Sequence, residues 1–349
     1  MGNRYDTRYD YRIATIDDVS DIMDFIRAEW GENHILANDR KLFIWQYGCQ
    51  EYGDDSTINV VLMTEKDGQI VGLIGFIPYS NNKACLHIST AITKIRANDV
   101  MPMAGIELMR RQVALVGEKV NFASGTNPNT ILPIFQKVFK HKVGYMEQYY
   151  ILNLELDNTI AAPCFDDYID DFYEYPYILK EISSFGDLSN SYDLNEKNEH
   201  MSIKSPEFIN KRYFEHPYYT YRKWLINDFD NKTVGVIFGR EITIGVSKIL
   251  RIVDYRGDLV YLEKIGRALH DLLKSEKYEY VDLMVSDLSN YNIQQAGFNK
   301  LNPDGKTIIP HYFEPFVKAN IKNYYQNNGD VVIFKADGDQ DRPNRVPRE

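Results

Sequence analysis

The chain has 349 residues, of which 44% are hydrophobic and 26% charged, a composition typical of a soluble globular protein. This length exceeds what one hydrophobic core usually serves, so we expect two domains. The net charge of −10 excludes a general nucleic-acid binder, which needs a basic surface. No apolar run approaches the ~20 residues of a membrane span. The cysteines Cys49, Cys85 and Cys164 lack metal-type spacing, which favours a reducing cytoplasm and no metal.

The first informative stretch predicts three strands followed by a helix. Apolar runs over residues 59–64 and 70–79 are joined by a Lys-Asp-Gly turn, which is typical of a β-hairpin. Residues 84–95 are rich in β-branched side chains and predict a third strand. After a short break, apolar residues recur at helical spacing over residues 103–117. A helix start presents free backbone N–H groups, so this turn is a candidate site for phosphate.

The next elements complete a recognisable order. Residues 120–124 predict a strand, residues 130–140 a short amphipathic helix, and residues 147–154 a further strand. Over residues 11–154 the chain resembles the GNAT superfamily of acyl-CoA-dependent N-acyltransferases. The resemblance rests on the hairpin, the strand that ends at Thr93, the turn into Gly105, and the run from Asn129 to Gly144-Tyr145. It implies an α/β (α+β) fold with a mixed sheet flanked by helices.

The resemblance implies an acyl-CoA co-substrate, either acetyl-CoA or a short hydroxyacyl-CoA. GNAT proteins usually carry Gln/Arg-x-x-Gly-x-Gly/Ala at the turn, and here only Gly105 matches. Because backbone amides rather than side chains bind the pyrophosphate, the turn still predicts a CoA site. The candidate CoA-binding residues, taken from the matching positions, are Ala91, Ile92, Thr93, Met101, Met103, Ala104, Gly105 and Asn129. The first three of these also correspond to the backbone that donates to the oxyanion.

Direct acyl transfer from a thioester to an amine needs a neutral amine, an oxyanion donor and a path for protons. His87 is the only ionisable side chain from Cys85 to Thr93, so it is the candidate base, with a purely structural histidine as the alternative. Many GNAT proteins place a tyrosine on the helix after the fifth strand as the general acid. That region here reads Ile134-Phe135-Gln136, so this acid is absent there.

The acceptor site is predicted from aromatic and amide-rich segments. The segment after the first helix contributes His34, Trp45 and Gln46, groups that stack on rings and hydrogen-bond hydroxyls. This run resembles acyltransferases of bacterial surface-polysaccharide (O-antigen or capsule) synthesis, which acylate nucleotide-linked amino sugars. The second half resembles the same subgroup and adds Arg212, Tyr218, Tyr221 and Arg222, for a diphosphate and a base. The alternative for each residue is a core or solvated surface position.

The domain organisation follows from charge and element order. Residues 1–154 form the GNAT-like domain, and residues 155–200 an acidic connector with twelve carboxylates and two lysines. Residues 201–349 predict a divergent GNAT-like domain for the acceptor. It has strands at 233–240, 241–247 and 248–255, a helix at 259–274, and a polar tail from residue 337.

The combined prediction is a cytoplasmic N-acyltransferase for a small dTDP- or UDP-linked amino sugar, with no nucleic-acid or membrane partner and an open oligomeric state. One alternative is an acyltransferase for a peptide or aminoacyl acceptor. The other is a non-catalytic GNAT-like binding protein, which the poor glycine turn favours.

Overall fold

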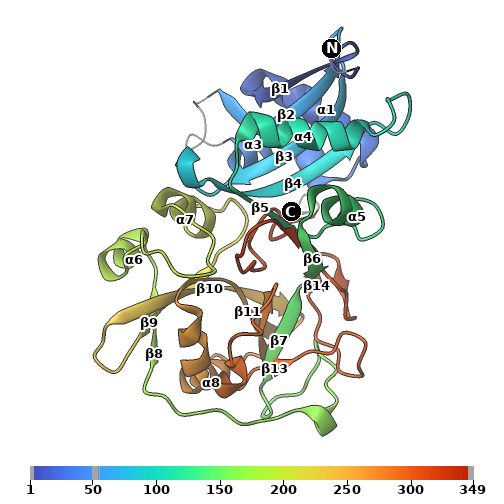
Figure 1. Cartoon of the computed structure of the whole chain (residues 1–349). Coiled ribbons are helices and arrows are strands. Elements are labelled where there is room, and N and C mark those ends of the chain that lie inside the picture. Colours follow the sequence, from blue (N-terminus) through green and yellow to red (C-terminus); the bar gives the residue numbers. More distant parts are fainter. Residues whose placement is uncertain (1–3, 49–53, 55, 345–349) are drawn as a thin grey trace.

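Seven strands form the first sheet, in the order β1-β2-β3-β4-β5-β16-β6 (Figure 1). The computed structural model describes residues 4–48, 54 and 56–344. The strands of this sheet are β1 (Tyr9–Thr15), β2 (Thr57–Glu65), β3 (Ile70–Pro78), β4 (His87–Ile95), β5 (Val120–Ser124), β6 (Lys142–Tyr145) and β16 (Tyr324–Asn327). Neighbours in β1 to β4 are antiparallel, whereas β4 and β5 are parallel.

The second sheet repeats this arrangement, in the order β8-β9-β10-β11-β12-β7-β13. Its strands are β7 (Glu147–Leu152), β8 (Ile178–Ile182), β9 (Arg222–Asn227), β10 (Thr233–Ile244), β11 (Ser247–Gly257), β12 (Tyr280–Val285) and β13 (Asn299–Lys300). Strands β8 to β11 are antiparallel neighbours, and β11 and β12 are parallel. A separate ribbon pairs β14 (Tyr312–Phe313) with β15 (Phe316–Val317). The predicted second, divergent half is therefore confirmed, as is the mixed α/β class.

Each sheet takes one strand from the other half of the chain. Strand β16, near the C-terminus, lies between β5 and β6 and is antiparallel to both. Strand β7 leaves the first half and lies between β12 and β13 in the second sheet. The sheets therefore do not divide at the predicted boundaries of residues 154 and 201, because β7 precedes the first boundary and β8 lies within the predicted connector.

Helices cover both faces of the first sheet, and its central strands β2 and β3 are therefore buried along almost their whole length. Helix α4 packs on the face that includes Val61 and Met63, whereas α1, α2 and α3 pack on the face that includes Val60 and Leu62. Because successive side chains of a strand point to opposite faces, these helices bury both faces of β2. The helices of the chain are α1 (Val19–Glu29), α2 (Ile35–Asn38), α3 (Arg40–Tyr47), α4 (Ala104–Val116), α5 (Leu132–Ile134), α6 (Phe185–Ser191), α7 (Pro206–Tyr213) and α8 (Gly266–Ser275).

Three predicted features of the second half are wrong. The three strands expected over residues 233–255 are two, since β10 runs on to Ile244 and the chain turns at Gly245, where φ is +62°. The helix expected from residue 259 begins as a 3₁₀ turn, Leu259–Lys264, and α8 follows. The third error concerns the C-terminus. Residues 337–344 form no tail: Asp337, Asp339 and Asp341 are buried, and this segment lies between the two sheets (Figure 1).

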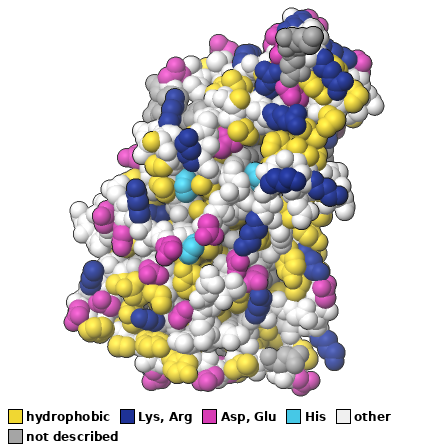
Figure 2. All heavy atoms as spheres, viewed as in Figure 1, with side chains coloured by type: hydrophobic (Ala, Val, Ile, Leu, Met, Phe, Trp, Pro, Cys, Tyr) yellow, Lys and Arg dark blue, Asp and Glu magenta, His cyan; other side chains and the backbone are white. Residues whose placement is uncertain are grey.

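The surface and the cysteines add little that is specific. Figure 2 shows Lys and Arg side chains interspersed with Asp and Glu on one face, without a continuous basic stripe there. No helix within the described ranges is long and apolar enough to cross a bilayer. Cys85 and Cys164 are free and partly buried, and Cys49 lies outside the described residues.

Candidate functional site

The site begins where β4 and β5 separate. The two strands pair only from His87 to Ser89, so β4 continues towards Ile95 without this neighbour. In the same part of β4 the register with β3 shifts, and Ala91 and Ile92 lie opposite the single residue Gly75. Such a β-bulge leaves a backbone N–H group outside the ladder. Ala91 and Ile92, predicted as backbone donors to an oxyanion, therefore form the bulge, and Thr93 resumes the pairing.

The ring of Tyr47, from the end of α3, lies against this bulge. A Cβ atom added at Gly75 would be 2.7 Å from Tyr47 Cε1 and 2.8 Å from Ile92 Cγ1, so only glycine permits this approach. The Tyr47 hydroxyl is fully buried and makes no hydrogen bond with the described residues. Burial first and then the charge of Asp339 raise the pKa of Tyr47 above its usual range, and the charge of Arg342 opposes this increase. This hydroxyl therefore stays protonated at neutral pH and is available as a donor.

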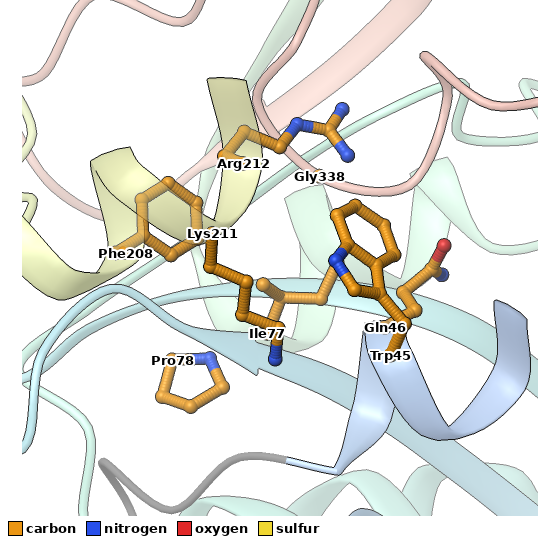
Figure 3. Close-up of a pocket in the computed structure, with 8 residues that line it drawn as sticks. All are labelled: Trp45, Gln46, Ile77, Pro78, Phe208, Lys211, Arg212 and Gly338. Atoms are coloured by element: carbon orange, nitrogen blue, oxygen red, sulfur yellow. The ribbon is translucent and has the colours of Figure 1, made fainter. Parts of the chain in front are cut away.

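A small cavity lies between α3, the end of β3, α7 and the C-terminal segment, and we call it the α3–α7 cavity (Figure 3). Its lining residues are Trp45, Gln46, Ile77, Pro78, Phe208, Lys211, Arg212 and Gly338. Its volume is about 30 Å³, and this holds roughly two water molecules.

Several polar atoms of this cavity are buried without a protein partner. They are Trp45 Nε1, both amide atoms of Gln46, and Arg212 Nε. Buried polar groups are normally satisfied, so a cluster of unsatisfied groups marks a place for a polar ligand or water. Three residues predicted for the acceptor, Trp45, Gln46 and Arg212, thus meet in one cavity although they come from α3 and α7.

Two cations flank the Trp45 ring. Lys211 Nζ is 6.0 Å and the Arg212 guanidinium carbon 5.8 Å from the ring centre. Arg212 Nη2 also donates to the carbonyl oxygens of Ala336 and Asp341, at 3.1 and 3.3 Å. The C-terminal segment therefore holds the guanidinium in place.

A buried ion cluster fixes that segment to both halves. Lys204 Nζ lies 2.6 Å from Asp254 and 2.8 Å from Asp337, and all three side chains are at most 1% exposed. The hydroxyl of Tyr79, on the residue after β3, donates to Asp337 at 3.0 Å. Burial raises the pKa of Asp337, and the charge of Lys204 opposes this increase. The segment predicted as a tail is thus anchored by residues far away in the sequence.

Asp341 is the second anchor of this segment. The Tyr221 hydroxyl donates to Asp341 at 2.6 Å, and Arg240 lies 3.4 Å from it. Burial alone would raise the pKa of Asp341, but the charges of Arg240 and Arg212 outweigh burial and lower it. Tyr221, predicted to stack on a base, is 2% exposed and packs edge-on to Tyr213 instead.

The remaining predicted acceptor residues lie outside the α3–α7 cavity. His34 caps α2, its Nδ1 accepting from the Leu36 amide at 3.2 Å, and burial lowers its pKa to about 4. Tyr218 is exposed and donates to Asp39. Arg222 pairs with two carboxylates of the second half, Glu181 and Glu276, at 2.6 and 2.9 Å.

The predicted base does not lie beside the bulge. His87 begins β4, and Ile92 is five residues along the strand, or about 16 Å at ~3.3 Å per residue. Its Nδ1 accepts from the Ile203 amide at 3.2 Å, and burial lowers its pKa to about 4. The catalytic role of His87 stays a prediction that this geometry does not support.

The turn before α4 keeps part of the predicted cradle. The Met101 amide already donates to the Tyr9 hydroxyl at 2.9 Å, whereas the amides of Met103 and Gly105 make no hydrogen bond within the described part of the chain. Met103 has a left-handed backbone, with φ at 63°, just before Ala104 starts the helix. A Cβ at Gly105 would make only ordinary contact, so glycine is not required there. Asn129 is exposed in the loop that follows β5.

Two solved structures share this arrangement over most of their length. A conserved Enterococcus faecalis protein of unknown function, called a probable N-acyltransferase, is 11% identical, and the match covers 94% of this chain and 73% of that one at a TM-score of 0.53. A GCN5-related N-acetyltransferase from Anabaena variabilis is 12% identical, with 92% and 72% covered and the same TM-score. The chain has a two-domain GNAT fold. No family model and no curated protein matches the sequence.

Within the GNAT fold, the sequence placed Tyr47 only in an aromatic run, and it predicted the C-terminal segment as a polar tail pinned by salt bridges rather than as a buried part of the site. The signal for Tyr47 was Gly75, a glycine inside an apolar strand, which marks a close approach. The segment had no such signal, because its aspartates resemble a solvated tail until Lys204 and Arg240 are seen beside them. Among the described residues, no group of three or more His, Cys, Asp or Glu is arranged to hold a metal ion.

Proposed function

We propose that this chain is an acyl-CoA-dependent N-acyltransferase whose acceptor amine enters the α3–α7 cavity. One observation carries the proposal. The β4 bulge at Ala91 and Ile92 lies against Tyr47, which follows Trp45 and Gln46 on α3, and the polar atoms of all three α3 side chains are buried without protein partners. A backbone donor for an oxyanion and an unsatisfied polar pocket beside it are the two parts that acyl transfer to an amine requires.

The cavity favours a neutral amine although its described lining holds no base. Its described lining contains Lys211 and Arg212 and neither a histidine nor a carboxylate. Nearby positive charges disfavour an ammonium ion, so the pKa of a bound amine falls and its proton goes to water. The neutral amine is the nucleophile that the reaction needs.

The bulge and Tyr47 then act on the two sides of the reacting carbonyl. As the C–N bond forms, a backbone N–H of the bulge stabilises the oxyanion. As the C–S bond breaks, the Tyr47 hydroxyl, which burial keeps protonated, gives its proton to the thiolate. The proton that the nitrogen loses as it becomes an amide passes through water to restore the Tyr47 hydroxyl. Among the described residues, neither Cys85 nor Cys164 lines the cavity, and we propose that transfer is direct.

We further propose that the acceptor is a nucleotide-linked amino sugar and that the reaction takes place in the cytoplasm. The Trp45 ring suits the apolar face of a sugar, and the Gln46 amide offers a donor and an acceptor to its hydroxyls. Lys211 and Arg212 favour an acceptor that carries negative charge nearby.

The test begins with calorimetric titration of the protein with CoA. Saturable binding near one site per chain supports the acyl-CoA site, and its absence refutes the proposal. Thiol release from acyl-CoA is then measured with dTDP- and UDP-linked amino sugars and, as the competing class, with peptide amines. Activity only with peptides would remove the sugar acceptor and keep the acyltransferase.

A matched pair of variants locates the acceptor. Gln46→Leu removes a buried amide from the cavity, and Gln294→Leu makes the same change at an exposed position. We expect Gln46→Leu to raise the KM for the acceptor about tenfold or more with CoA affinity unchanged, since one polar contact amounts to ~1.5 kcal/mol. Gln294→Leu should leave both unchanged. Equal KM values for the two variants would move the acceptor elsewhere.

A further inference from the structure

A second cavity lies in the other half of the chain, and we call it the basic cavity. Its volume is about 40 Å³, and four cations line it: Arg240 of β10, Arg251 of β11, Lys335 and Arg342. The other lining residues are Tyr219, His311, Tyr312, Phe313, Glu314, Gln340 and Asn344. It shares no lining residue with the α3–α7 cavity.

Lys335 is buried there without a partner. Lys335 is only 6% exposed, and its ammonium makes no ion pair or hydrogen bond with residues 4–48, 54 and 56–344. Charged side chains this deep are normally paired, because removal of an ion from water costs several kcal/mol. Burial first and the charge of Arg251 next lower the pKa of Lys335 to about 8, which is how an unpaired buried ammonium behaves.

Two of the arginines also keep a free donor. Arg240 lies 3.4 Å from Asp341 and Arg342 lies 3.3 Å from Asp339, but the Nε atom of each arginine is buried without a partner. Arg251 differs, because Asp282 and two backbone carbonyls take its donors. Arg240, Arg342 and Lys335 are therefore the groups that retain capacity to bind.

The carboxylates around the cavity do not balance these cations. Asp282, Asp339 and Asp341 pair with the arginines, and Glu314 lines the cavity. Asp341 also offsets the charge of Arg212. These four carboxylates therefore face five cations, which are the four that line the cavity and Arg212. The protein as a whole carries a net charge of −10, so this local excess of positive charge runs against its overall charge.

We propose that the basic cavity binds a phosphate group. Free guanidinium Nε–H groups and a compact ammonium approach from β10 and from the C-terminal segment, which suits a tetrahedral anion better than a planar carboxylate. A volume of about 40 Å³ accommodates roughly three waters or one phosphate. We assign the phosphate to the diphosphate of the acceptor. That assignment rests on the proposed function, whereas phosphate binding itself does not.

The experiment is calorimetric titration of the full chain with inorganic phosphate, with UMP and with UDP. We expect saturable binding of phosphate and at least tenfold tighter binding of UDP. If UDP binds no more tightly than phosphate, the site takes free phosphate and the assignment to the acceptor is overturned. If wild-type protein binds none of the three, the proposal is overturned. CoA titration of the same preparation is independent of these results, so failure here and failure of the acyltransferase are distinguishable.

Variants place the binding at this cavity. Lys335→Met should weaken phosphate binding at least tenfold, and Lys335→Arg should keep it within about threefold. The control is Lys322→Met, which removes an exposed lysine paired with Asp304. Equal binding by Lys335→Met and Lys322→Met would overturn the proposal. If Lys335→Met does not fold, the result for Lys335→Arg and competition by sulfate on wild-type protein decide the question.

Discussion

Lys204 holds the C-terminal segment in place, and Lys204→Met tests this directly. The ammonium lies 2.6 Å from Asp254 and 2.8 Å from Asp337, with all three groups out of water. Methionine keeps the length of the side chain but leaves two buried carboxylates without their cation. Loss of one partner from a buried ion pair costs about 3–5 kcal/mol. With a guanidinium m-value of roughly 5 kcal/mol per M, the unfolding midpoint should fall by about 0.8 M.

The matched control is Lys322→Met, whose exposed pair with Asp304 contributes at most about 1 kcal/mol. The pH dependence gives a second readout. Burial already raises the pKa of Asp337, and loss of Lys204 removes the charge that opposes this increase. The native variant then binds more protons than the unfolded chain above the ordinary pKa of an aspartate, so its stability falls as pH rises. The deficit should therefore be smaller at pH 5 than at pH 7. A deficit below 1 kcal/mol, or one that grows on acidification, would refute this reasoning.

Three further substitutions test the site. Tyr47→Phe should lower the rate of thiol release about 100-fold, which is the usual contribution of a general acid, and should leave CoA binding unchanged. An unchanged rate would show that Tyr47 is not the acid. Gly75→Ala should destabilise the fold by about 1–3 kcal/mol, because the new Cβ overlaps Tyr47 and Ile92, and a neutral effect on unfolding would contradict the close packing. His87→Asn should keep thiol release near wild type at pH 7. It should also reduce the loss of stability between pH 6.5 and 4. In that range the unfolded chain binds a proton at His87, whereas the folded protein, in which the pKa of His87 is about 4, does not. Loss of turnover in this variant would restore His87 as the base.

Local patterns predicted β2, β3, β4 and β5 well because the signals of these strands are short-range. Strand β5 begins and ends where the apolar run does, and the Lys-Asp-Gly turn sets the hairpin of β2 and β3. The second half misled the same reasoning at Arg240 and Glu241, a charged pair within β10 that was read as a break. Asp341 compensates the charge of Arg240, and it lies 101 residues further along the chain. Sequence periodicity cannot show a partner at that separation.

The candidate residues of the site also divide into those that line the α3–α7 cavity and those that make internal contacts. Trp45, Gln46 and Arg212 were found because aromatic, amide and guanidinium groups are unusual in those helices. Tyr221 and Arg222 carry the same kinds of groups, but the structure uses them in internal contacts with Asp341 and Glu181. Residue type therefore identified candidates, and only the packing of distant elements separates those that face the cavity from those that support it.

The exchange of β7 and β16 between the two sheets has a consequence for folding during synthesis. Strand β6 ends at Tyr145 and β16 begins only at Tyr324, so a ribosome must make the whole second sheet before the first sheet can close. Until then the edges of β5 and β6 that β16 will occupy are exposed, and such edges pair readily with other chains. We therefore expect chaperones to bind the nascent first half. We also expect that neither half is soluble when it is expressed alone. Co-expression of the two halves should recover what separate expression loses.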